Sequence, residues 1–88
     1  MLDLDSAWRL NPRVALRPEP FGALAYHFGT RRLSFLKTPK LVAVVESLGE
    51  HGSVRAALDS ASVTHDETTA YVSALERLAS GEMIVPVE

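Results

Sequence analysis

The most informative absence in this 88-residue sequence is cysteine. Without a thiol, the chain forms no disulfide framework, offers no thiol nucleophile and cannot hold zinc or an iron–sulfur cluster through thiolates. The absence of cysteine fits a cytoplasmic protein, and the acidic stretch at residues 1–5 lacks the bases of a signal peptide. We therefore expect a cytoplasmic location.

Long apolar runs, phosphate-binding loops and catalytic constellations are absent as well. No apolar stretch approaches the roughly 18 residues of a membrane span, so no membrane partner is expected. The five glycines are isolated and form neither a GxGxxG nor a P-loop pattern. His27, His51 and His65 lie far apart, without the spacing of metal ligands. The sequence thus predicts no enzyme, no metal and no cofactor.

What the sequence does contain is enough apolar residues for one core. The hydrophobic fraction is 47%, which argues against disorder. Eighty-eight residues are typical of a single domain, here spanning 1–88, with modest stability because a chain of this size buries roughly 60–65% of its unfolded surface.

Period-two alternation of apolar residues marks the N-terminal part and predicts strands. Pro18 ends the first segment, a glycine turn joins the second to the third, and Pro39 ends the third. The three segments cover residues 13–17, 23–28 and 32–37. We expect them to form a three-stranded antiparallel meander.

The third segment is expected to lie at the edge of this sheet, because no later stretch is an obvious second partner. Leu33 and Phe35 would form its half-buried face. If the Ser34 N–H faces the free edge, a Ser34→Pro change would test whether that edge is used. A free edge either must be protected or serves as a docking rail for another chain.

The periodicity changes to three or four after Thr38, which predicts helices. Thr38 caps a first helix that ends at Gly49, and Ser53 caps a short second one. Either Thr64 or Asp66 caps a third helix that runs to Ser80, and residues 83–87 form a short strand or extended tail. The predicted class is α+β and winged helix-turn-helix-like, with the three-stranded sheet followed by three helices.

The charge distribution weighs against one function of such folds. Residues 1–40 carry seven Lys and Arg against three acids, and residues 41–88 carry two against eight. The candidate recognition helix holds Asp66, Glu67 and Glu76 but only one base, Arg77. DNA affinity depends on neutralising phosphates, so we expect no nucleic-acid partner and keep a winged-helix DNA-binding regulator as the alternative.

The third helix offers two flanks beside its apolar centre. Helical angles place Tyr71, Ala74 and Leu78 on one flank, and Val72, Glu76 and Ala79 on the other. A flank overhanging the free strand edge would create a groove for an extended peptide. Alternatively these residues pack inward and Arg32 and Lys37 protect the edge, or the edge pairs with a second copy to give a homodimer.

The N-terminal turn sequence resembles a known family. Between Trp8 and Leu36 the chain reads Arg9-Leu10-Asn11-Pro12-Arg13-Val14 and then Arg17-Pro18-Glu19-Pro20-Phe21-Gly22. This pattern is similar to that of the PqqD-like domains that recognise precursor peptides, and in particular to the peptide chaperones of the mycofactocin pathway. The length and the order of elements agree over the whole chain.

The resemblance implies a non-enzymatic chaperone with two partners. Such domains bind the leader of a ribosomally made precursor peptide and present it to a radical S-adenosylmethionine enzyme. The leader adds as a strand beside the third strand and against the third helix. Carried over by position, the resemblance implies a peptide site made of Arg32, Leu33, Ser34, Phe35, Leu36, Thr68, Tyr71, Ala74, Leu75 and Leu78.

Overall fold

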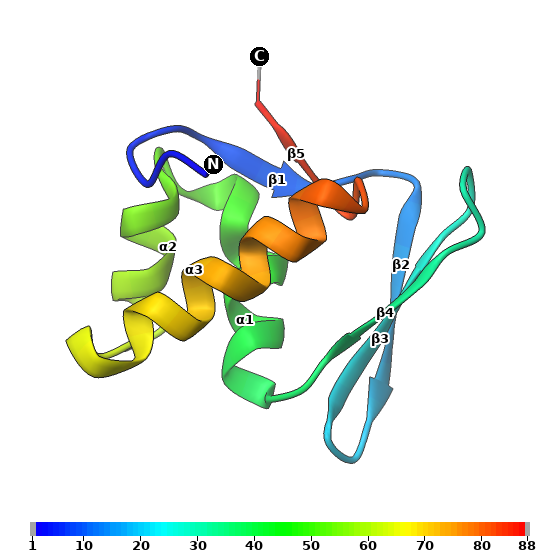
Figure 1. Cartoon of the computed structure of the whole chain (residues 1–88), viewed down its shortest axis with the longest axis horizontal. Helices are drawn as coiled ribbons and strands as arrows, with labels where there is room; N and C mark the ends of the chain where they lie inside the picture. The colour runs from blue at the N-terminus through cyan, green and yellow to red at the C-terminus, as the bar shows by residue number, and fades with distance from the viewer. Residues whose placement is uncertain (1, 88) are drawn as a thin grey trace.

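The predicted meander is present in the computed structural model, which describes residues 2–87. Strands β2 (Val14–Glu19), β3 (Gly22–His27) and β4 (Leu33–Leu36) form an antiparallel sheet in the order β2-β3-β4. The α+β class, with this sheet followed by three helices, is confirmed. Figure 1 shows the helices gathered on one side of the sheet, which projects from them.

Strand β2 runs farther than the sequence predicts. We expected Pro18 to end it, but β2 continues to Glu19, and Pro18 lies opposite Ala23. The Phe28 N–H donates to the Arg13 carbonyl, so the alternation of the ladder leaves the Pro18 nitrogen facing away from β3. The missing N–H therefore costs no ladder bond, as is usual for proline on an edge strand.

Small side chains on the inner face of β3 let the helices approach. Ala23 and Ala25 are buried there, while Leu24 and Tyr26 alternate onto the outer face. His27 is the one buried polar residue of the sheet, and its Nδ1 accepts hydrogen bonds from the N–H groups of Gly29 (3.0 Å) and Thr30 (3.1 Å). The histidine thus holds the β3–β4 turn, and this leaves no lone pair for a metal at Nδ1.

The helices begin at the predicted caps. Thr38 Oγ1 accepts from Leu41 N at the start of α1 (Pro39–Ser47), which continues as the 3₁₀ turn η1 (Leu48–Glu50). Ser53 caps α2 (Val54–Ser60) through Ala56 N. Of the two caps proposed for α3 (His65–Ser80), the structure uses Thr64, whose N–H donates to the Glu67 carboxylate at 3.0 Å.

A second sheet joins the two ends of the described chain. Strand β1 (Trp8–Leu10) pairs antiparallel with β5 (Ile84–Pro86), and Asn11 N donates to the Met83 carbonyl at 2.9 Å. Residues 83–87 were expected to form either a short strand or an extended tail, and the structure has the strand; β1 was not predicted. The tail pairs with β1 and not with β4, so it does not occupy the edge of the three-stranded sheet.

The core lies between the inner face of the sheet and the helices. Its largest fully buried side chains come from β4, α1, η1, α2, α3 and the start of the tail: Leu36, Val44, Val45, Leu48, Val54, Leu75, Met83 and Ile84. Within residues 2–87, no helix has both the length and the hydropathy needed to cross a membrane.

Candidate functional site

The outer edge of β4 is bare, and its exposed main-chain groups belong to Leu33 and Phe35. His27 N donates to the Arg32 carbonyl at 3.0 Å, which fixes the alternation along β4. Ser34 therefore points its N–H and C=O toward β3, and the groups of Leu33 and Phe35 point away from the sheet. The expectation that the Ser34 N–H faces the free edge is wrong by one residue, so proline at Ser34 would damage the sheet itself.

The side chains of β4 also alternate in the opposite sense to the prediction. Phe35 is 58% exposed and Leu33 is 57% exposed, whereas Leu36 is completely buried. The inward positions are Ser34 and Leu36, which pair with Ala25 and Ala23 on the inner face of β3. Leu33 and Phe35 were mistaken for core residues because apolar side chains occur on both faces of this strand.

The two edges of the sheet differ in their capacity to accept another strand. On β2, the outward position of Pro18 has no N–H to donate. On β4, residues 33–36 contain no proline, and within residues 2–87 no further strand pairs with this edge. The β4 edge is therefore the one whose outward donors and acceptors are not interrupted by a proline.

A groove runs between this edge and α3. Two adjoining hollows, of about 330 Å³ and 210 Å³, share the side chains of Phe35, Leu41, Ala74 and Arg77. We call this the edge groove; it is lined by Ser34, Phe35, Lys37, Thr38, Leu41, Ala70, Tyr71, Ala74, Arg77 and Leu78. Its α3 wall is the flank that carries Tyr71, Ala74 and Leu78, while Glu76 and Ala79 face another hollow beside Leu2 and Trp8.

Half of the predicted peptide-site residues line the edge groove. They are Ser34, Phe35, Tyr71, Ala74 and Leu78. Leu36 and Leu75 are fully buried and support the groove from below, and Leu33 lies on the outer face of the sheet. Arg32 is exposed in the turn before β4, and the Thr68 hydroxyl donates to the Thr64 carbonyl within its own helix.

The predicted peptide site leaves out the residues that give the groove its charge, although Lys37 was considered as a residue that protects the edge. Lys37 and Arg77 both line it, and neither forms an ion pair with a carboxylate of residues 2–87. No acidic side chain lines either hollow. Arg77 lies three residues after Ala74 and Lys37 directly follows β4, so helical spacing and strand order were signals that would have placed both.

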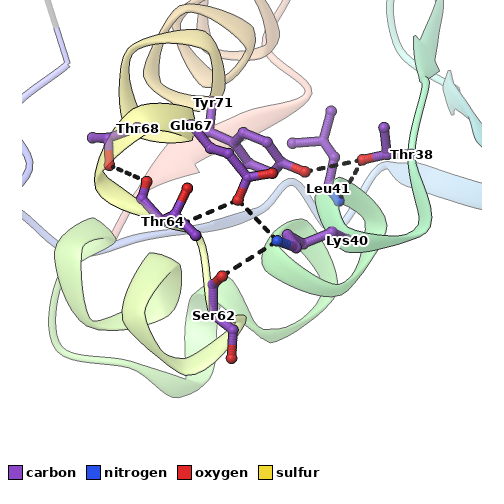
Figure 2. Close-up of polar contacts among 8 residues, drawn as sticks. All are labelled: Thr38, Lys40, Leu41, Ser62, Thr64, Glu67, Thr68 and Tyr71. Atoms are coloured by element: carbon purple, nitrogen blue, oxygen red, sulfur yellow. Dashed lines mark hydrogen bonds and ion pairs between the residues drawn. The ribbon is translucent and has the colours of Figure 1, made fainter.

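A polar network fixes the two walls of the groove relative to each other. Figure 2 shows Lys40 of α1 reaching the Glu67 carboxylate of α3 at 2.9 Å and the Ser62 carbonyl at 3.2 Å. The hydroxyl groups of Thr38 and Tyr71 are hydrogen-bonded at 3.2 Å, which joins the end of β4 to α3. The start of α1 is thereby tied to the first half of α3 at the end of the groove.

The ion pair shifts the titration of both partners. The hydrogen bond from Lys40, reinforced by the Thr64 N–H, lowers the pKa of the Glu67 carboxyl below its usual 4.5. The same hydrogen bond, in which Lys40 is the donor, raises the pKa of the Lys40 ammonium above its usual 10.5. Both groups are therefore charged across the neutral range, and the tie between α1 and α3 persists there.

The side chains of residues 2–87 were also compared with the requirements of a metal site. Within residues 2–87, no cluster of three His, Asp or Glu side chains has the arrangement of a metal site. The groove itself combines main-chain donors and acceptors, apolar side chains and two cations. A free strand edge beside an apolar helix flank is one of the recurring arrangements to which extended peptides add in other proteins.

A family model and three known proteins that match this sequence all carry the same family name. A sequence model of the peptide chaperone MftB family matches residues 7–85. The chain is 55% identical over 86 residues to a peptide chaperone MftB of Mycobacterium ulcerans, covering 98% of this chain and 79% of that protein.

Two further relatives carry the same name. The chain is 54% identical over 84 residues to the protein of Mycolicibacterium smegmatis, with 96% of this chain and 82% of the relative covered. It is 51% identical over 84 residues to the protein of Mycobacterium tuberculosis, with 96% and 77% covered. No solved structure matches the chain, so the winged-helix description remains an interpretation of the element order.

Proposed function

The chain belongs to the peptide chaperone MftB family, and on that basis we propose that it binds the leader of a precursor peptide as an added strand beside β4. The bound leader is then presented to a radical S-adenosylmethionine enzyme, which carries out the chemistry. The observation that carries this proposal is the bare edge of β4 beside the edge groove.

The main-chain geometry supports strand addition. Leu33 and Phe35 each present one N–H and one C=O to an incoming strand, so four ladder hydrogen bonds are available over the roughly 13 Å of β4. Main-chain bonds of this kind supply affinity without demanding a particular sequence. Preference for one leader then comes from the side chains of the groove.

The groove lining points to the chemistry of the leader. Leu41, Ala74 and Leu78 form an apolar floor and wall, and Lys37 and Arg77 leave two cations without carboxylate partners among residues 2–87. A leader that alternates apolar residues with an Asp or Glu would bury its apolar side chains and neutralise these cations. An Asp→Asn or Glu→Gln change in the leader is expected to weaken binding.

The alternative of a DNA-binding regulator has less physical support. The first turn of α3, the candidate recognition helix, carries Asp66 and Glu67, and its one base, Arg77, faces the edge groove. Carboxylates at the leading end of the helix would meet the phosphates of a duplex unfavourably. We therefore do not propose this function.

Calorimetric titration with the leader segment of the precursor peptide tests the proposal directly. We compare Phe35→Pro with Phe35→Ala, because both remove the ring but only proline removes the outward N–H. Since that N–H makes no bond to β3, both variants should fold. We expect Phe35→Ala to weaken binding modestly and Phe35→Pro to weaken it by at least about a further tenfold.

Two results would contradict the proposal. If the unaltered chain shows no saturable heat with the leader, the chaperone function itself is wrong. If it binds but the alanine and proline variants have equal affinity, the leader does not add to the β4 edge.

A further inference from the structure

The outer face of the three-stranded sheet is apolar yet uncovered. Tyr26 and Leu33 pair across β3 and β4 on this face, and a hollow of about 290 Å³ lies beside them and Leu24. Phe28 is 62% exposed and packs edge-on against the Tyr26 ring, with ring centroids 5.0 Å apart. Figure 1 shows no helix on this side of the sheet.

Four of the five large hydrophobic residues that are exposed among residues 2–87 belong to this sheet and its turns: Phe21, Phe28, Leu33 and Phe35. At the other end of the same face, the rings of Phe21 and Phe35 lie 6.0 Å apart, and both residues are exposed. Contiguous apolar surface of this kind marks contact with another macromolecule more often than chance exposure. Tyr and Phe are also the residue types enriched at the centres of protein interfaces.

Cations are frequent in the strands and turns of this sheet, and Arg17 lines the hollow itself. Residues 13–38 contain five Lys and Arg but only one acid, Glu19, which is paired with Arg17 at 2.7 Å. The remaining four cations form no ion pair with a carboxylate of residues 2–87, and all four are exposed: Arg13, Arg31, Arg32 and Lys37. An apolar centre with a basic rim is complementary to a surface with an apolar centre and an acidic rim.

This charge pattern favours some binding partners of the outer face over others. Two copies packed through this face would bring the two basic rims together, which like-charge repulsion disfavours. Single-stranded nucleic acid binds best to a row of open aromatic faces, and the edge-to-face contact between Tyr26 and Phe28 covers one of the faces in this pair. A folded protein that inserts an apolar side chain beside Leu24 and Leu33 fits both the hollow and the rim.

We propose that the outer face of the β2-β3-β4 sheet, centred on Tyr26 and Phe28, is the surface that docks on the modifying enzyme, and that the enzyme meets it with an apolar side chain inside an acidic rim. The inference rests on the proposed chaperone function. The edge groove and the outer face meet at β4 but point in different directions. The leader and the enzyme can therefore be held at the same time, and the leader lies at the margin of the enzyme contact.

The test measures two affinities for each variant of the full chain. Surface plasmon resonance gives the affinity for the radical S-adenosylmethionine enzyme, and calorimetry gives the affinity for the leader. The variants are Phe28→Ser, which removes an exposed ring, and Arg17→Glu, which reverses the charge of the one cation that lines the hollow and does not line the edge groove. Arg9→Glu is the matched control, because it makes the same charge change at the exposed position of β1.

We expect Phe28→Ser and Arg17→Glu each to weaken enzyme binding by roughly tenfold or more, with leader affinity within about twofold of the unaltered chain. Arg9→Glu should change neither affinity. Far-UV circular dichroism confirms that the variants are folded. Unchanged enzyme affinity in both variants overturns the inference while leaving the proposed function intact, because leader binding is measured separately.

Other occupants would give different results. A fluorescent oligonucleotide that binds at low salt and is released by Phe28→Ser would assign the face to nucleic acid and overturn the inference. A concentration-dependent dimer, seen by sedimentation and lost in Phe28→Ser without a change in enzyme affinity, would assign it to a second copy and also overturn it. Failure of the unaltered chain to bind the leader would instead remove the function on which the inference rests.

Discussion

At the scale of single residues, Gly22 lies directly against the main chain at the end of β4. It has φ of +155°, and a Cβ built there would collide with the Leu36 carbonyl oxygen and lie 3.1 Å from Thr38 N. Those atoms are main chain at the end of β4, where the edge groove begins, and they cannot move aside as a side chain would. The glycine of the Arg-Pro-Glu-Pro-Phe-Gly segment is therefore required by this close approach.

We predict that Gly22→Ala destabilises the fold by at least about 1–3 kcal/mol from backbone strain alone, with the clash adding to it. Urea denaturation followed by circular dichroism measures the change. Gly52→Ala is the control, because a Cβ at Gly52 meets no atom within 4 Å. Gly52→Ala is expected to change stability by less than about 0.5 kcal/mol. Equal effects of the two substitutions would contradict the close approach at β4.

At the scale of elements, the ion pair between Lys40 and Glu67 links α1 to α3 across 2.9 Å. The pKa of Glu67 is lowered in the fold, so its contribution to stability is full above pH 4.5 and is lost as the pH falls through the lowered value. The pKa of Lys40 is raised, so its contribution is full below pH 10.5 and is lost as the pH rises through the raised value.

We therefore predict a specific pH profile for Glu67→Gln. The difference in unfolding free energy between the unaltered chain and this variant should be nearly constant from roughly pH 5 to 10 and should shrink at both ends. Denaturation at a series of pH values measures it. Glu46→Gln, at an exposed position of α1, is the control. A difference that grows as the solution becomes acidic would contradict the assigned role of Glu67.

The positions of β2, β3, β4 and the helices could be predicted from the sequence, but the direction in which β4 faces could not. Alternation and caps placed β2, β3, β4 and the helices, because these signals are local: Thr38, Ser53 and Thr64 each cap the helix predicted for them. The inward face of β4 could not be predicted, because Leu33, Phe35 and Leu36 put apolar groups on both faces. Which residue presents its N–H outward depends on the register with β3, and a one-residue error reverses it.

At the scale of the whole molecule, β1 was invisible to sequence reasoning because its partner, β5, lies more than seventy residues away. Three residues of Trp8–Leu10 carry too short a pattern to predict a strand. The residues that line the edge groove were also predicted only in part. The pairing of an α3 flank with β4 was predicted from helical angles, but the strand order and helical spacing that place Lys37 and Arg77 beside it were not used to include these two cations.

We predict that the small β1-β5 sheet unfolds together with the rest of the protein. Ile84 is 1% exposed, and Ile84→Ala should cost about 2–5 kcal/mol. Val87→Ala, at an exposed position of the same segment, should cost less than about 0.5 kcal/mol. Fluorescence of Trp8, in β1, and far-UV circular dichroism should report the same urea midpoint. An earlier transition at Trp8 would show that this sheet frays independently.

The pairing of β5 with β1 has a consequence during protein synthesis. Met83 and Ile84 complete the core, so the fold cannot close until the ribosome has added nearly all of the described chain. Helix caps and the β2-β3-β4 hairpins depend on local contacts and form earlier, whereas long-range pairing comes last. For that interval the nascent protein displays a bare strand edge over an unfinished interior, and it is then most exposed to misassociation.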